Sequence, residues 1–166
     1  ARPGIERFDV MTDPFHLVVD RDDTGLGVEA VSLADVAHRP FITSPTDLSC
    51  GRCVVVACRD AGFEPRVHHE LDDFPTAGHL VAAGLGVALI PALGLHRLPP
   101  GVRALELDPP VNRTIQLATR TASAERPAII AVRDTLVVAV WHDHRAPPPS
   151  TRQWSKGCIT STGHGA

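Results

Sequence analysis

The stretch that decides the fold runs from Leu80 to Pro91 and reads LVAAGLGVALIP. Residues 80–83 suit the last turn of a helix, and Gly84 can adopt the left-handed backbone conformation that ends one. The apolar run 87–90 has the length of a buried strand and stops at Pro91. A helix that passes through a double-glycine turn into a buried strand is typical of an α/β domain.

The composition indicates a globular, water-soluble chain. Its 166 residues are 43% hydrophobic, which is enough for one ordinary core or two small ones. No apolar run approaches the roughly 20 residues that span a bilayer, and the first ten residues, ARPGIERFDV, lack the apolar core of a signal peptide. We therefore expect a cytoplasmic chain that does not enter a membrane.

The charge pattern argues against direct nucleic-acid binding. The net charge is -3, and the 16 basic residues are spread along the chain instead of forming a cluster. Surfaces that bind DNA or RNA normally carry clustered positive charge. This chain is not expected to be the part of a protein that holds nucleic acid.

Hydrophobic periodicity and turn residues predict alternating strands and helices, without internal repeats. We expect a loop over 1–13, and a tail without regular structure from Ala146. We expect a second loop over 92–101, between strand 87–90 and the next strand. The other predicted strands are 15–19, 41–42, 67–71, 102–107 and 113–120, and the predicted helices are 33–38, 47–61, one from Asp73 to the turn at Gly84, and 128–142. Gly62, Gly84 and Gly86 are assigned to structural turns.

Five segments carry a family resemblance. They are PFHLVVDRDD (14–23), VSLADVAHRPFITS (31–44), ACRDAGFEP (57–65), LVAAGLGVALIP (80–91) and RTIQLATR (113–120). In this order and spacing they resemble the effector-binding domain of LysR-type transcriptional regulators, over about residues 8–142. The resemblance implies a type II periplasmic-binding-protein-like α/β fold, in which two subdomains are joined by two crossover strands and a small-molecule effector binds between them.

The resemblance also implies how the chain is divided. Residues 1–19 would be the end of the first subdomain with the first crossover strand, and residues 20–111 the complete second subdomain. Residues 112–145 would be the return strand and final helix of the first subdomain, followed by a disordered tail over 146–166. The family's winged helix-turn-helix and most of its first subdomain have no counterpart here. We therefore expect DNA contact only through a domain absent from this chain, one wall of the effector cleft to be missing, and homo-oligomers in the full-length protein.

Two helix starts are the candidate effector site. A hydroxyl-rich turn precedes the long helix, and residues 73–76 begin the next one. Helix N-termini carry unpaired N–H donors and a partial positive charge, so two of them at one cleft favour an anionic effector. The alternative is that these hydroxyls only cap their helices, and Asp72 and Asp73 would oppose an anion unless they face away. The candidate effector-binding residues are Thr43, Ser44, Pro45, Thr46, Phe74 and Thr76.

The cysteines offer a second chemistry. Cys50 and Cys53 form a CxxC at a predicted helix start, which can act as a redox pair. Buried structural thiols are the commoner use, and the spacing from Cys53 to Cys58 does not match one helix face. A zinc site with the adjacent His68 and His69 lacks a second ligand pair at finger-like spacing. We expect reduced thiols, no metal and no cofactor.

An enzyme is not expected. The sequence has no nucleophile elbow and no phosphate loop, and its GLG lies after a helix, where dinucleotide binding needs a strand first. The predicted function is the effector-sensing and oligomerising domain of a LysR-type regulator. The alternative is a stand-alone solute-binding protein of the same fold, which would carry an export signal.

Overall fold

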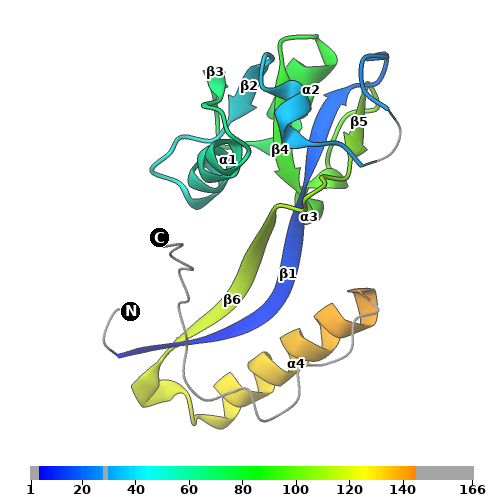
Figure 1. Cartoon of the computed structure of the whole chain (residues 1–166). Coiled ribbons are helices and arrows are strands. Elements are labelled where there is room, and N and C mark those ends of the chain that lie inside the picture. The colour runs from blue at the N-terminus through cyan, green and yellow to red at the C-terminus, as the bar shows by residue number, and fades with distance from the viewer. Residues whose placement is uncertain (1–3, 28–29, 145–166) are drawn as a thin grey trace. The chain divides into compact units, whose positions relative to one another are not determined.

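The computed structural model describes residues 4–27 and 30–144, which fall into two compact units. The larger unit is Thr12–Arg113, and the smaller unit combines Ala1–Met11 with Thr114–Ala166. Each unit is described by itself (Figure 1). Strands β1 and β6 contribute residues to both units.

The elements follow the predicted order closely. They are β1 (Ile5–Asp20), η1 (Leu33–Val36), β2 (Pro40–Thr43), α1 (Ser49–Asp60), β3 (Arg66–Glu70), α2 (Phe74–Ala82), β4 (Val87–Pro91), α3 (Ala92–Leu95), β5 (Val102–Leu105), β6 (Asn112–Arg120), η2 (Thr121–Ser123) and α4 (Pro127–His144). The predicted helices at 33–38, 47–61 and 128–142 are confirmed, the first as a 3-10 helix. The tail expected from Ala146 lies outside the described residues.

A mixed sheet forms the centre of the larger unit. Its strand order is β3-β2-β4-β1-β5, with β2 parallel to β3 and β4, and β1 antiparallel to β4 and β5. Leu17 of β1 faces Leu89 of β4 on one side and Leu105 of β5 on the other. The run 15–19 is therefore a central strand, as its apolar sequence predicts.

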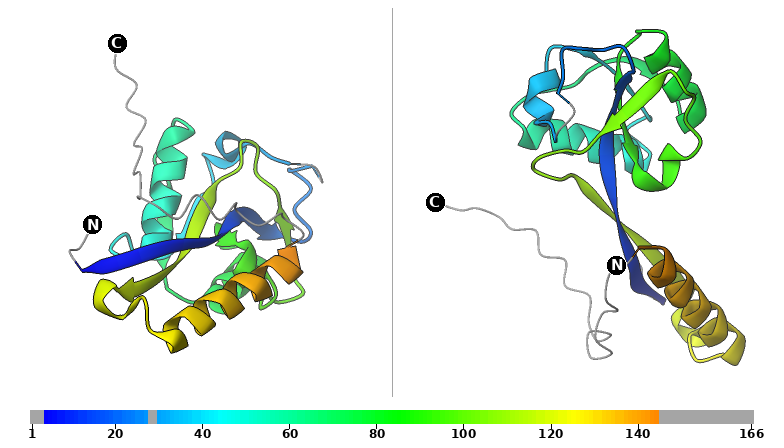
Figure 2. Two further views of the ribbon diagram at one scale, coloured as in Figure 1. Left: turned by 90° about the horizontal axis from the view of Figure 1, so that it is seen from below. Right: turned by 90° about the vertical axis from the view of Figure 1, so that its right-hand side faces the viewer.

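Both faces of this sheet are covered. Alternate strand residues such as Phe41 and Leu89 pack with Val54 of α1 in one core, and their neighbours such as Ile42 pack with Val81 of α2 in the other. Figure 2 (right) shows α1 and η1 on one side of β1 and α2 on the other. Because side chains from both faces are buried, the inner strand β4 reads as a continuous apolar run, whereas the edge strand β3 is mostly exposed and largely polar.

The stretch 80–91 forms the expected helix, turn and strand. Gly84 (φ 73°) has the left-handed conformation, and the Leu85 N–H donates to the Leu80 carbonyl at 3.1 Å. Gly86 (φ 154°) lies against β2, where an added Cβ would come within 2.5 Å of the Pro40 carbonyl oxygen. Gly62 (φ 89°) follows α1 in the same way. These turns bring β4 beside β2.

Two predicted loops are wrong. Residues 1–13 are not a loop, because β1 begins at Ile5 and pairs with β6. The charged residues in the first part of β1 make it look like a loop in the sequence. In the structure exposed and half-buried residues alternate there, and Asp9 accepts a hydrogen bond from Gln116 at 2.6 Å. The loop predicted over 92–101 begins with the short helix α3, where a Cβ on Gly94 would lie 2.6 Å from the Phe74 ring, so only glycine fits.

The smaller unit leaves apolar side chains exposed. It contains the first part of β1, most of β6, η2 and α4, and the Arg133 guanidinium lies 5.7 Å from the Phe8 ring centroid. Val132, Leu136 and Val138 of α4 are 56%, 42% and 55% exposed. None of the helices within the described residues is long and apolar enough to cross a membrane.

Candidate effector site

A small depression with apolar and polar lining residues lies at one edge of the sheet in the larger unit. Strands β2 and β4 are parallel, so their carboxyl ends reach the same edge, and α1 and α2 begin beside it. In open α/β sheets this edge is the usual place for ligands. The depression has a volume of about 10 Å³, and its polar lining residues are Thr43, Ser44, Cys50 and Asp73. This volume is close to the space that one water molecule needs.

The end of β2 supplies two buried hydroxyls. Thr43 and Ser44 are only 7% and 6% exposed. The Ser44 hydroxyl donates to an Asp72 carboxylate oxygen at 3.4 Å, whereas the Thr43 hydroxyl has no hydrogen-bond partner. A buried polar group without a partner costs free energy. Thr43 therefore presents an unused hydrogen-bonding group at the depression.

The structure brings together three of the six predicted site residues. Thr43, Ser44 and Phe74 all line the depression. Thr76 lies at the start of α2, where its hydroxyl and its N–H donate to one oxygen of Asp73, the N-cap residue of this helix, at 2.5 and 2.8 Å. These hydrogen bonds lower the pKa of Asp73 below its ordinary value. Pro45 and Thr46 do not line the depression, and Thr46 is exposed.

The start of α1 is packed tightly against the β2 turn. A Cβ on Gly51 would lie 2.2 Å from the Ser44 carbonyl oxygen and 2.3 Å from that of Pro45, so only glycine allows this approach. Leu48, which precedes α1, makes no side-chain capping bond to the helix. Sequence reasoning missed Gly51; a glycine inside a predicted helix was the available signal.

A buried ion pair beside the depression was also missed. The Asp13 side chain is fully buried and accepts hydrogen bonds from Arg113 Nε at 2.8 Å and from the Leu93 N–H at 3.1 Å. Arg113 Nη2 lies 2.7 Å from the same Asp13 oxygen, and Nη1 donates to Cys50 Sγ at 3.1 Å. An aspartate at the start of an apolar run was the only sequence signal, and its partner lies 100 residues away.

The cysteines are free thiols in the described part of the chain. Cys50 and Cys53 are half-buried, and Cys58, also a residue of α1, is buried in the core that this helix covers. Burial raises the pKa of Cys58 to about 12. Across residues 4–27 and 30–144, no group of three or more histidine, cysteine or acidic side chains could hold a metal ion.

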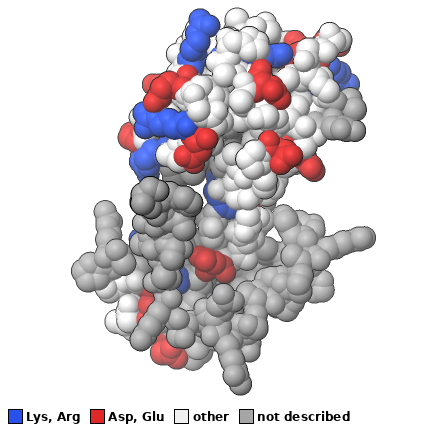
Figure 3. All heavy atoms as spheres, in the orientation of Figure 1, with Lys and Arg blue, Asp and Glu red and all other residues white. Residues whose placement is uncertain are grey.

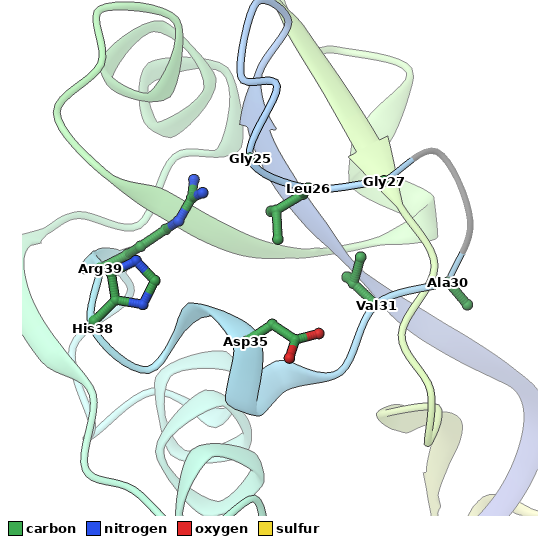
Figure 4. Close-up of a pocket in the computed structure, with 8 residues that line it drawn as sticks. All are labelled: Gly25, Leu26, Gly27, Ala30, Val31, Asp35, His38 and Arg39. Carbon is green, nitrogen blue, oxygen red and sulfur yellow. The ribbon is translucent and has the colours of Figure 1, made fainter.

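A second, larger pocket lies at the loop after β1 (Figure 4), with a volume of about 640 Å³. Its charged lining groups already have partners. Arg39 pairs with Asp23 and thereby lowers the pKa of that carboxyl, and Asp35 accepts the Ser32 N–H at 3.2 Å. Residues 28–29, which follow its lining residue Gly27, lie outside the described residues. We therefore place the candidate site at the smaller depression.

Charged side chains are mixed on the face shown in Figure 3. Over the larger unit, arginines and acidic residues alternate, and the described part of that face shows no continuous basic patch. This pattern agrees with the scattered basic residues of the sequence.

The fold belongs to the class of periplasmic-binding-protein-like effector domains. The BenM effector binding domain, solved with its effector benzoate, aligns with a TM-score of 0.76 at 22% identity and covers 90% of this chain and 69% of that one. A putative LysR family regulator from Pseudomonas aeruginosa aligns with a TM-score of 0.73 at 18% identity, over 84% and 50% of the two chains. Both likenesses concern the fold.

The chain belongs to the LysR substrate binding domain family, whose family model matches residues 1–141. The probable HTH-type transcriptional regulator LrrA of Synechococcus elongatus is 34% identical over 137 residues, which are 81% of this chain and 46% of LrrA. The regulator ShiR of Corynebacterium glutamicum is 33% identical over 52% of this chain and 30% of ShiR. The chain thus spans less than half the length of these relatives, which are transcriptional regulators and not enzymes. The predicted fold class and family are confirmed.

Proposed function

We propose that this chain is the effector-sensing part of a LysR-type transcription regulator, working in the cytoplasm and catalysing no reaction. DNA would be bound by another part of the full-length protein, which we expect to be a homo-oligomer. The family match and the regulator relatives support this function. Among solved relatives in fold, CbnR has been seen with its target DNA and BenM with benzoate.

We place the effector at the depression formed by Thr43, Ser44 and Phe74, with Pro45, Thr46 and Thr76 on the flanking turns. The observation that carries this assignment is the buried Thr43 hydroxyl without a partner. A ligand oxygen there would complete its hydrogen bonding. Because the depression itself is small, it would form one wall of the complete site.

We place a small anionic group of the effector on the α1 side of the depression, near Cys50. The Arg113 guanidinium donates a hydrogen bond to Cys50 Sγ there and supplies positive charge. The Asp72 and Asp73 carboxylates precede α2, where Asp72 accepts the Ser44 hydroxyl and Asp73 caps the helix. These carboxylates would repel an anion, so the less polar part of the effector is placed on that side, against Phe74. Benzoate in BenM is a ligand of this chemical class.

The proposed organisation treats residues 20–111 as a complete subdomain. Residues 1–19 and 112–145 would belong to the first subdomain and its crossover strands. Thr12–Arg113 forms a compact unit separate from the rest of the chain, which supports this division. Effector binding would then favour one arrangement of the full-length regulator over another and so alter its DNA contacts.

Thermal unfolding against a panel of small carboxylates, with benzoate included, tests the proposal. A ligand present at 100 times its Kd stabilises the folded state by about 2.7 kcal/mol. The Thr43→Val variant should keep its fold and lose this stabilisation, while Thr24→Val, at an exposed position that does not line the depression, should retain it. The proposal fails if no carboxylate raises the melting temperature, or if both variants respond like the parent chain.

A further inference from the structure

The Cys50 sulfur occupies an unusual position in the fold. Cys50 is the second residue of α1, is half-buried, and lines the depression at the sheet edge. Arg113 Nη1 donates a hydrogen bond to its Sγ at 3.1 Å. The only thiol that lines this depression is therefore held beside a guanidinium group.

The guanidinium is itself fixed in place. Its Nε and Nη2 atoms lie 2.8 and 2.7 Å from one oxygen of the fully buried Asp13, and the Leu93 N–H holds the other oxygen at 3.1 Å. The Arg113 Cζ atom also lies 5.9 Å from the centroid of the Phe15 ring. With these contacts the guanidinium cannot turn away from Cys50, so the sulfur has a defined position.

A second group in the same depression is free to hold a ligand. The Thr43 side chain is more than nine-tenths buried, lines the depression and has no hydrogen-bond partner. Its hydroxyl can donate to a carbonyl oxygen. The depression therefore combines a positioned nucleophile with an unused hydrogen-bond donor.

We propose that Cys50 is a covalent modification site for small α,β-unsaturated carbonyl compounds, whose carbonyl oxygen is bound by the Thr43 hydroxyl. The thiol proton passes to water and the sulfur electron pair forms a C–S bond to the β-carbon of the compound. The C=C π bond breaks, negative charge develops on the carbonyl oxygen at Thr43, and the α-carbon then takes a proton from water. The addition is redox-neutral and needs no other reactant.

The other thiols of α1 differ from Cys50. Cys58 is completely buried, and this burial raises its pKa to about 12, so its reactive anion is scarce at neutral pH. Cys53 packs against the core on the α1 face of the sheet. Modification should therefore be selective for Cys50. An adduct there would be larger than the depression and would extend out of it, and, if the proposed function holds, it would exclude the effector.

The test is the labelling rate of each cysteine in the folded chain of 166 residues with N-ethylmaleimide, an α,β-unsaturated carbonyl compound. Trypsin cuts after Arg52 and Lys156, so Cys50 and Cys158 lie on different peptides from Cys53 and are quantified separately by mass spectrometry. We expect Cys50 to react at least about tenfold faster than Cys53 and Cys58. Equal rates for Cys50 and Cys53 in the folded chain would overturn the proposal.

Thr43→Val and the control variant Thr24→Val separate this chemistry from simple exposure. Thr43→Val should slow maleimide labelling of Cys50 about three- to tenfold, which corresponds to the loss of one hydrogen bond. Labelling by iodoacetamide, a displacement that places no new charge on a carbonyl oxygen, should be unchanged. Thr24→Val, at an exposed position outside the depression, should alter neither rate. A Thr43→Val variant that labels like Thr24→Val would refute the role of the hydroxyl. Because these rates are measured without an effector, their outcome tests the Cys50 proposal independently of the proposed function.

Discussion

Replacing Arg113 by methionine is the most informative perturbation of the larger unit. The variant leaves the fully buried Asp13 carboxylate with only the Leu93 N–H as a hydrogen-bond donor. Removing one partner of a buried pair typically costs about 3–5 kcal/mol, because the remaining charge stays buried without compensation. This is a large part of the roughly 5–15 kcal/mol that stabilises an ordinary domain. For a unit of about 100 residues, the melting temperature should fall by more than about 12 °C.

Urea unfolding followed by circular dichroism measures this loss. Arg59→Met is the matched control, since Arg59 pairs with Glu64 at the surface, where its side chain is 60% exposed, and its removal should change stability little. The double variant Asp13→Asn/Arg113→Met should be more stable than Arg113→Met alone, because asparagine keeps an acceptor for Leu93 and removes the buried charge. The reasoning is refuted if Arg113→Met behaves like Arg59→Met, or if the double variant is the least stable of the three.

Three further outcomes follow from the described contacts. Gly86→Ala should destabilise the chain more than Gly84→Ala in the same urea assay. Both residues have positive φ, so an added Cβ costs roughly 1–2 kcal/mol at either position. Only the Cβ at Gly86 would also collide with the backbone of β2. The Arg39 hydrogen bond lowers the pKa of Asp23 from 3.8. The ion pair therefore stabilises the fold above about pH 4, and this stabilisation is lost as the pH falls through the lower pKa of the folded state. Asp23→Asn should remove this part of the acid dependence of the melting temperature, and an unchanged dependence would contradict the prediction. Val138→Ser on the exposed face of α4 should reduce self-association in sedimentation without lowering the melting temperature, whereas a clear loss of stability would show that Val138 is covered.

The elements that the sequence predicts best are those whose signals are local. The run 87–90 is buried on both faces, so it is apolar throughout, and Gly62 and Gly84 mark helix ends by their positive φ. The assignment of Thr43 and Ser44 to the effector site stays a prediction, based on their position after a short apolar strand and before a helix, which is where ligands meet α/β sheets.

The parts that the sequence could not predict depend on distant partners. The first part of β1 was missed because its pairing with β6, more than 90 residues later, stabilises a charged strand that has no apolar stripe of its own. The same holds for Arg113, which reads as one arginine among many until Asp13 and Cys50 are placed beside it. The effector role of Thr76 also stays a prediction, because a hydroxyl that donates to the Asp73 N-cap, as it does in the structure, looks the same in sequence as one that binds a ligand.

The central claim is that the effector site lies at the edge formed by β2 and β4, and a ¹⁵N–¹H NMR titration tests it most directly. The titrant is the carboxylate that raises the melting temperature most. The account predicts that amide shifts concentrate at Thr43, Ser44 and Phe74 and disappear in Thr43→Val. Shifts centred instead on the larger pocket near Gly25 and Arg39, or retained in Thr43→Val, would contradict it.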